Sequence, residues 1–240
     1  MNKGSLTYSD YYKLFKKNII KTKFFKKKHL QPSSMDLTLS NECYEIKSSF
    51  LSPNTNVREK LKKFFIKRIN LDKSYIFKKK KTYLVKLNEN LNLSKALFGK
   101  CNPKSSTGRL DIFCRTILNF SNEYEKIPKG YKGELFLEIT SQAFDIKFKS
   151  GDSLNQIRLI NRKKSVLSDF QLLKYHKINP LFFSSSEKLN TSFFNLGLKI
   201  SVDLDNQNSI IAYKAKKNTP TLEFNKTKKH KINDFWKPIK

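Results

Sequence analysis

Short runs in which apolar and polar residues alternate dominate the middle of the chain. They begin with "TYLVKLN" at 82–88 and continue through "KALFGKCN", "LDIFCRTI", "ELFLEIT", "FDIKFKS" and "NQIRLI". Pro, Gly, Asn and Ser separate these runs, and alternation of this kind is typical of strands with one buried face. The pattern predicts a mainly β protein of the barrel, jelly-roll or sandwich type.

Helical patterns are confined to short segments. We expect helices over "DYYKLFKKNII" at 10–20, "NVREKLKKFFIKRI" at 56–69 and "VLSDFQLLKYHKI" at 166–178. Ser9 is a candidate cap for the first of them. A Ser/Asn-rich loop is expected at 184–192. The fold should therefore carry only a few short helices.

Two segments resemble each other within the chain. "SSMDLTLSNECYEIK" at 33–47 and "ISVDLDNQNSIIAYKAK" at 200–216 share Ser-x-Asp-Leu and, after a spacer, Tyr-x-x-Lys. Matches this short are common by chance, so alone they are weak support for a duplication.

The charge is large but unevenly distributed. The 240 residues carry a formal net charge of +29, which ordinarily suggests a nucleic-acid partner. Residues 11–28 hold eight lysines and no acid, whereas 101–160 holds nine basic and seven acidic residues. No basic-aromatic module such as an RNP signature is present. Solvated lysine faces are the preferred interpretation, and nucleic-acid binding is the lesser alternative.

Several classes of protein are disfavoured by what the sequence lacks. Cys43, Cys101 and Cys114 are widely spaced and form no CxxC pair, so no disulfide framework is predicted. The His/Cys/Cys signature of zinc deaminases and the GxSxG elbow are both missing. No apolar run has membrane-spanning length, and the N-terminus does not look like a signal peptide. We expect a cytoplasmic protein with no protein-built metal cage.

The segment "KSSTGR" at 104–109 stands out because it concentrates serines, a glycine and an arginine. The chain has six arginines against forty-three lysines, so an arginine is notable where a planar fork of donors is useful. Ser105, Ser106 and Arg109 could bind a phosphate while Gly108 lets the backbone approach. The alternative is a serine-rich turn between strands, and the hexapeptide alone favours that alternative.

Glu138 lies in a strand whose two faces both look apolar. Leu135, Leu137 and Ile139 alternate with Phe136 and Glu138. A carboxylate there is costly unless it is paired or functional. A general base and an ordinary edge-strand glutamate are equally compatible with this pattern.

Taken in order, four segments resemble the dCTP deaminases of the dUTPase-like superfamily. They are Gln-Pro-Ser-Ser-x-Asp-Leu at 31–37, Lys-Ser-Ser-x-Gly-Arg at 104–109, Gly-Tyr-x-Gly followed by Leu-Glu at 130–138, and Gly-Asp-x-x-x-Gln at 151–156. The resemblance is best with the longer enzymes that have two tandem domains, and it extends to "DFWKPI" at 234–239.

This resemblance implies a dUTPase-like β-barrel or jelly roll (β-clip) over 1–185 and the start of a second, incomplete domain over 186–240. It implies a trimer with active sites between subunits. The implied reaction is zinc-independent hydrolysis of dCTP to dUTP and ammonia, within pyrimidine deoxynucleotide metabolism. Mg²⁺ would enter with the triphosphate.

The resemblance also implies roles for particular residues. Glu138 corresponds to the general base, and Arg109 and Ser106 assist it by orienting the attacking water. The substrate-binding set is Lys104, Ser105, Ser106, Arg109, Tyr131 and Gln156.

One departure from the family pattern concerns sugar recognition. Pro128 and Lys129 stand where many members have Asp-Pro, and that Asp reads the deoxyribose 3′-hydroxyl. Glu125 lies nearby without an assigned role. We therefore expect a C-terminal partner, or the missing part of a truncated two-domain enzyme, to complete the site. A self-sufficient homotrimer is the alternative, and the rival functions are a dUTP diphosphatase and a catalytically incomplete nucleotide-binding subunit.

Overall fold

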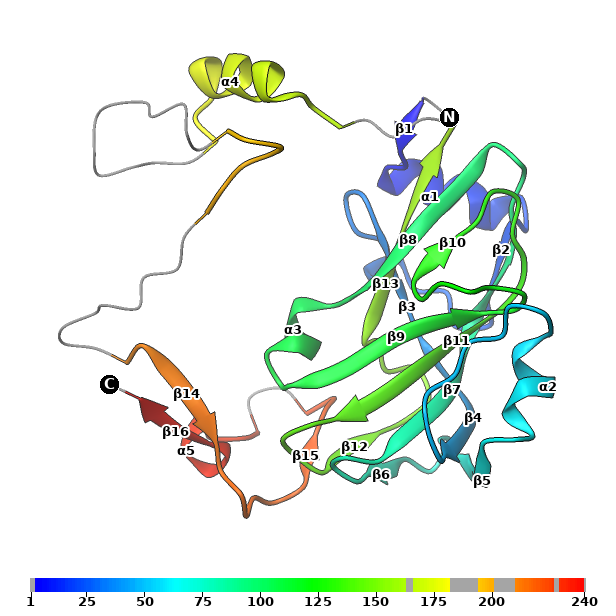
Figure 1. Cartoon of the computed structure of the whole chain (residues 1–240), viewed down its shortest axis with the longest axis vertical. Coiled ribbons are helices and arrows are strands. Elements are labelled where there is room, and N and C mark those ends of the chain that lie inside the picture. The colour runs from blue at the N-terminus through cyan, green and yellow to red at the C-terminus, as the bar shows by residue number, and fades with distance from the viewer. Residues whose placement is uncertain (1–2, 163–165, 182–193, 201–209, 227–228, 240) are drawn as a thin grey trace. The chain divides into compact units, whose positions relative to one another are not determined.

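A computed structural model describes residues 3–162, 166–181, 194–200, 210–226 and 229–239. The chain divides into two compact units, of which the first is Met1–Lys164 with Ala215–Lys237 and the second is Ser165–Lys214 with Pro238–Lys240. The first unit contains two antiparallel sheets, which we call sheets A and B (Figure 1).

Sheet A joins segments from both ends of the first unit. Its order is β1 (Gly4–Ser5), β13 (Asn155–Asn161), β8 (Leu97–Pro103) and β10 (Lys126–Ile127), and β3 (Met35–Leu37) also pairs with β13.

Sheet B is built around a long central strand. Its order is β5 (Phe65–Asn70), β4 (Leu39–Ile46), β7 (Thr82–Asn92), β11 (Lys132–Ser141) and β9 (Ile112–Leu118), and β2 (Ile20–Lys21) also pairs with β7.

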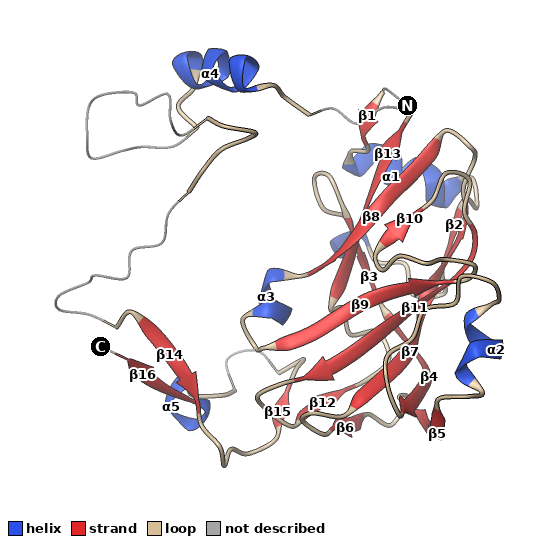
Figure 2. Ribbon diagram, viewed as in Figure 1, coloured by secondary structure: helices blue, strands red, loops and turns tan. Residues whose placement is uncertain are grey.

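The described residues also form two smaller sheets and several short helices (Figure 2). A three-stranded sheet has the order β15 (Leu222–Glu223), β12 (Ile146–Phe148) and β6 (Tyr75–Phe77), and β14 (Ala212–Ala215) pairs with β16 (Trp236–Ile239). The helices are α1 (Tyr8–Lys16), the 3-10 turn η1 (Lys27–His29), α2 (Val57–Leu61), α3 (Ser105–Gly108), α4 (Asp169–Ile178) and α5 (Ile232–Phe235).

The main core draws side chains from both sheets. Ile157 and Leu159 of sheet A belong to the same buried cluster as Leu137 and Ile139 of sheet B. A second, smaller cluster contains Ile46, Phe50, Val57, Leu61, Leu84, Ile117 and Phe136. Because neighbouring residues of a strand point to opposite faces, the second cluster covers the outer face of sheet B. Both faces of β11 are therefore buried over much of its length, as its sequence predicts.

The chain passes from sheet A to sheet B through a single residue, Thr38, between β3 and β4. The Thr38 N–H donates to Glu89 Oε2 (2.9 Å), and the Thr38 hydroxyl donates to Glu89 Oε1 (2.8 Å). Glu89 is 3% exposed, and burial raises the pKa of its carboxyl to about 7. This buried carboxyl thus fixes the junction of the two sheets.

The predicted mainly β architecture is confirmed, and each of the six alternating runs forms a strand. The helix predicted over 166–178 is observed as α4. The helix predicted over 56–69 is wrong in its second half, because 65–70 pair with β4 as the strand β5. Ser9 is not the cap of α1. Thr7 occupies that position, and its N–H and hydroxyl both donate to Asp10.

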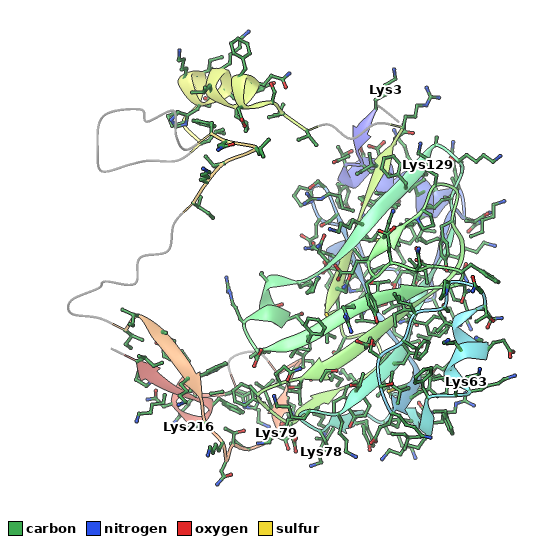
Figure 3. All side chains as sticks on the ribbon, viewed as in Figure 1. Lys3, Lys63, Lys78, Lys79, Lys129 and Lys216 are labelled. Carbon is green, nitrogen blue, oxygen red and sulfur yellow. The ribbon has the colours of Figure 1, made fainter. Side chains whose placement is uncertain are left out.

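Lysine side chains project from many parts of the first unit, including the labelled Lys3, Lys63 and Lys129 (Figure 3). The predicted loop at 184–192 and most of the internal repeat's second copy lie outside the described residues.

Candidate active site

The "KSSTGR" segment forms the short helix α3 with residues of the candidate phosphate site at both of its ends. Lys104 is the N-cap residue and Arg109 is the C-cap residue. The Lys104 N–H and the Thr107 hydroxyl both donate to the carbonyl of Leu154, at 2.9 Å each, and so tie α3 to the segment before β13. The side chains of Ser105, Ser106 and Arg109 are exposed and available to a ligand.

Polar residues on the outer face of sheet A lie beside α3. Lys104 Nζ forms an ion pair with the buried carboxylate of Asp36. Gln156 is the Cα partner of Asp36 in the β3–β13 ladder, and its Oε1 accepts a hydrogen bond from the Ser34 hydroxyl (2.9 Å). The sequence motifs 31–37, 104–109 and 151–156, distant in the chain, thus come together here.

Glu138 lies on the outer face of sheet B, directly opposite Arg115 in the β11–β9 ladder. The Glu138 side chain is only 3% exposed. Arg115 Nη2 and Nε donate to the same oxygen, Glu138 Oε1, at 2.7 and 3.2 Å. The other oxygen, Oε2, is buried and has no hydrogen-bond partner among the described residues. Glu138 is therefore paired through one oxygen, while the other is left as an acceptor.

Arg115 is itself held from several sides. Its Nη2 also donates to the Ser49 hydroxyl (3.0 Å), which in turn lies 2.6 Å from the Tyr124 hydroxyl. The guanidinium carbon lies 4.0 Å from the centre of the Tyr124 ring and 4.8 Å from that of Phe113. Such stacking restricts the plane of the guanidinium.

The predicted site residues other than Tyr131 thus fall into two groups on one chain. The first group lies on α3 and the outer face of sheet A, and the second lies on the outer face of sheet B. In the described ranges, no hydrogen bond or ion pair joins Ser105, Ser106 or Arg109 to Glu138.

Tyr131 belongs to neither group. It is 8% exposed and lies in the main core cluster, and burial raises its pKa to about 12. Its hydroxyl donates to the carbonyl of Glu134 (2.6 Å). A Cβ on Gly133 (φ +148°) would lie only 3.1 Å from this hydroxyl, which explains the glycine at that position. The Gly-Tyr-x-Gly motif thus has a structural role in shaping the start of β11.

Glu125, near the departure from the family pattern, is half-buried and has a left-handed backbone (φ 61°). Burial raises the pKa of its carboxyl, and Lys100, Asn155 and Arg115 act in the opposite direction. Its Oε1 has no hydrogen-bond partner among the described residues.

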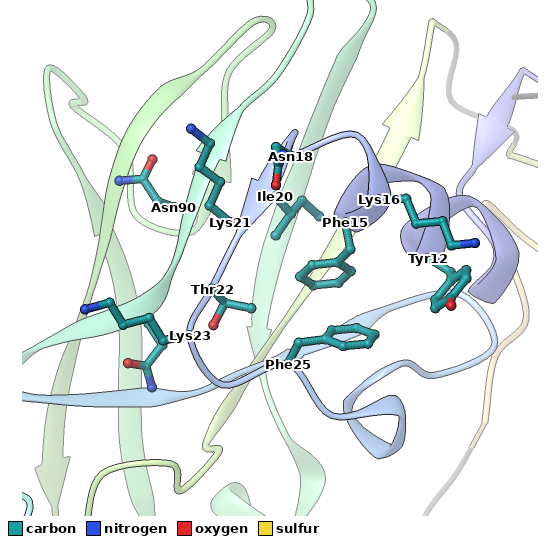
Figure 4. Close-up of a pocket in the computed structure, with 11 residues that line it drawn as sticks. Tyr12, Phe15, Lys16, Asn18, Ile20, Lys21, Thr22, Lys23, Phe25 and Asn90 are labelled. Atoms are coloured by element: carbon teal, nitrogen blue, oxygen red, sulfur yellow. The ribbon is translucent and has the colours of Figure 1, made fainter.

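A hollow of about 620 Å³ lies elsewhere, between α1, β2 and β7. Figure 4 shows the aromatic rings of Tyr12, Phe15 and Phe25 with Lys16 beside the Tyr12 ring, whereas Lys23 lies apart from the rings. None of the predicted site residues lines it. Within the described ranges, no cluster of three or more His, Cys, Asp or Glu residues is arranged to hold a metal, and no helix could span a membrane.

Sequence reasoning did not find two of the partnerships in these groups. Asp36 was noted only as part of a motif, and the pairing of Arg115 with Glu138 depends on strand register. The scarcity of arginine makes Arg115 notable, but it does not identify the partner of Arg115.

Comparison with known proteins identifies the family of the chain. The family model for the 2'-deoxycytidine 5'-triphosphate deaminase (DCD) N-terminal domain matches residues 2–163, and that for the DCD C-terminal domain matches residues 168–240. The chain belongs to the dCTP deaminase family.

Individual relatives point the same way. A crystal structure of 2'-deoxycytidine 5'-triphosphate deaminase from Agrobacterium tumefaciens has a TM-score of 0.90 and 32% sequence identity, covering 100% of this chain and 71% of that chain. The dCTP deaminase of Ignicoccus hospitalis strain KIN4/I is 20% identical over 162 residues, which are 68% of this chain and 86% of that protein. The fold is therefore the dUTPase-like fold predicted from the sequence.

Proposed function

We propose that this protein hydrolyses dCTP to dUTP and ammonia without zinc. The observation that carries the proposal is Glu138, a buried carboxylate with one oxygen bound by Arg115 and the other unpartnered. A general base needs such a free acceptor within reach of water. Membership of the dCTP deaminase family supplies the substrate class.

In this proposal Glu138 handles the proton throughout. Its Oε2 takes a proton from water as the water oxygen bonds to C4 of cytosine. The carboxylic acid then returns that proton to the amino group, and the C4–N bond breaks to release ammonia. The proton that remains on the C4 hydroxyl moves to N3, which leaves the C4 carbonyl of uracil. Arg109 and Ser106 orient the water and compensate the developing charge.

Lys104, Ser105, Ser106, Arg109 and Gln156 would receive the triphosphate. The exposure of Ser105, Ser106 and Arg109 at α3 supports this assignment, as does the position of Gln156 on sheet A. Mg²⁺ would arrive bound to the phosphates, as it does in many nucleotide sites. Tyr131 would contribute through its fixed ring rather than its hydroxyl, since the hydroxyl bonds to Glu134.

We further propose a cytoplasmic trimer in which the two polar groups come from different subunits. The separation of the α3 group from Glu138 on one chain supports sharing of this kind. An assembly with a C-terminal partner domain is the alternative.

Product analysis tests the proposed reaction. The purified 240-residue chain is incubated with dCTP or dUTP, and ammonia is measured separately from pyrophosphate. Ammonia release from dCTP is expected. Pyrophosphate release from dUTP would instead indicate a dUTP diphosphatase, and nucleotide binding without turnover would indicate an incomplete subunit.

Arg109→Lys is expected to weaken triphosphate binding or turnover at least about tenfold, because a bidentate contact to phosphate requires the planar guanidinium. Steady-state kinetics with dCTP would measure this. Arg162→Lys, an exposed arginine outside both polar groups, is the matched control and should behave as wild type. Wild-type kinetics in Arg109→Lys would show Arg109 to be an ordinary surface charge.

Metal removal should distinguish a catalytic zinc ion from Mg²⁺ that arrives with the triphosphate. A zinc-selective chelator is expected to leave deamination unchanged, because Glu138 carries the proton steps. Omission of Mg²⁺ should impair use of the triphosphate. Inactivation by the zinc chelator with rescue by added zinc would contradict the proposal.

A further inference from the structure

We propose that Arg115 is a positioning residue that confines the proton chemistry of Glu138 to Oε2. This inference rests on the proposed role of Glu138 as the base. Arg115 lies on β9 of sheet B and does not belong to the group on α3.

The hydrogen bonds of Arg115 reach only one of the two carboxylate oxygens of Glu138. Both Nε and Nη2 of Arg115 donate to Oε1, so this oxygen is occupied by positively charged donors. A proton placed on Oε1 would break these charge-assisted bonds. The proton taken from water must therefore reside on Oε2, which has no other partner among the described residues. One oxygen would accept the proton and later deliver it to the leaving amine.

Arg58 of α2 is a second arginine that binds carboxylates of sheet B, and its hydrogen bonds differ from those of Arg115. Arg58 donates to both oxygens of Glu42 and both oxygens of Glu134, at 2.6 to 3.1 Å. Those carboxylates have no oxygen left open by the arginine, as expected of structural ion pairs. The Arg115–Glu138 pair differs because half of the carboxylate is left open.

The guanidinium of Arg115 is also held by residues other than Glu138. Ser49 and the stacked rings of Tyr124 and Phe113 hold the guanidinium independently of Glu138. A preorganised donor needs no rearrangement when charge changes on its partner. A lysine at this position could supply the charge. It could not supply two donors to Oε1 in a fixed geometry, and it has no planar group to lie against the Tyr124 ring.

The test compares Arg115→Gln with Arg58→Gln, which removes a structural arginine that binds carboxylates of sheet B. The pH dependence of kcat/KM for dCTP is measured for each, together with the thermal midpoint. For Arg115→Gln the acid limb should move to higher pH, because the variant removes the positively charged donors that make protonation of Oε1 unfavourable. Turnover should also fall at least about tenfold. Arg58→Gln should lower the thermal midpoint without moving the acid limb. Arg115→Lys should keep the acid limb closer to its wild-type position than Arg115→Gln does.

A second measurement does not depend on activity. The side-chain carboxyl of Glu138 is followed by ¹³C NMR during a pH titration, with Glu138→Gln identifying its signal. The titration midpoint should be higher in Arg115→Gln than in wild type. An unchanged midpoint and acid limb, with only reduced stability, would overturn the positioning role. Failure of the wild-type chain to deaminate dCTP would instead overturn the proposed function, and the titration would still decide whether Arg115 acts on the carboxyl of Glu138.

Discussion

Replacing Glu138 with Gln is expected to lower dCTP deamination by more than about 10²-fold while nucleotide binding persists. Glutamine keeps the shape of the side chain and can still accept a hydrogen bond from Arg115 through its amide oxygen. It cannot take a proton from water, so the attack on C4 loses its base. The loss should therefore appear in kcat, with only a small change in dCTP affinity.

Glu134→Gln is the matched control for this experiment. Glu134 lies on the same strand, and hydrogen bonds and ion pairs from Arg58 and Lys86 lower its pKa to about 2. Its replacement should reduce stability and leave the chemistry intact. Unchanged deamination in Glu138→Gln, measured by ammonia release at saturating dCTP, would rule out Glu138 as the base.

The second large effect concerns stability and pH. Burial raises the pKa of Glu89 to about 7 from its ordinary 4.5, so the folded protein holds this proton over a range where the unfolded chain has released it. The contribution of Glu89 to stability should therefore be full below pH 4.5 and should be lost as the pH rises to about 7. The shift corresponds to about 3 kcal/mol across that window.

Glu89→Gln should remove this part of the pH dependence. The amide imitates the protonated carboxyl, since it can accept from the Thr38 N–H and donate to the Thr38 hydroxyl. Urea unfolding of wild type and variant at several pH values would measure the difference. Asp152 also has a raised pKa, at about 6, so Asp152→Asn is a control whose effect should end at lower pH. Parallel curves for wild type and Glu89→Gln between pH 6 and 7 would contradict the expectation.

The fold could be predicted from sequence wherever local pattern and tertiary environment agree. Along β11 the alternation of Leu135, Leu137 and Ile139 with Phe136 and Glu138 indicated both the strand and the burial of its two faces. The "KSSTGR" segment could be located because its composition differs so strongly from the rest of the chain.

The failures have a common physical cause, which is pairing between distant segments. Residues 65–69 continue a helical pattern after α2, but the unpaired edge of β4 offers backbone partners that local propensity cannot anticipate. The Arg115–Glu138 pair is likewise set by the β9–β11 register. Glu89 shows no local signal at all, because its partner Thr38 lies fifty-one positions away.

The passage through Thr38 limits where this protein can tolerate a change in length. An inserted residue at this junction would turn the following side chains of β4 to the opposite face or pull β3 out of register with β13. It would also remove the two Thr38 donors from the buried carboxyl of Glu89. Insertions and deletions compatible with folding should therefore fall in turns that join two strands of the same sheet.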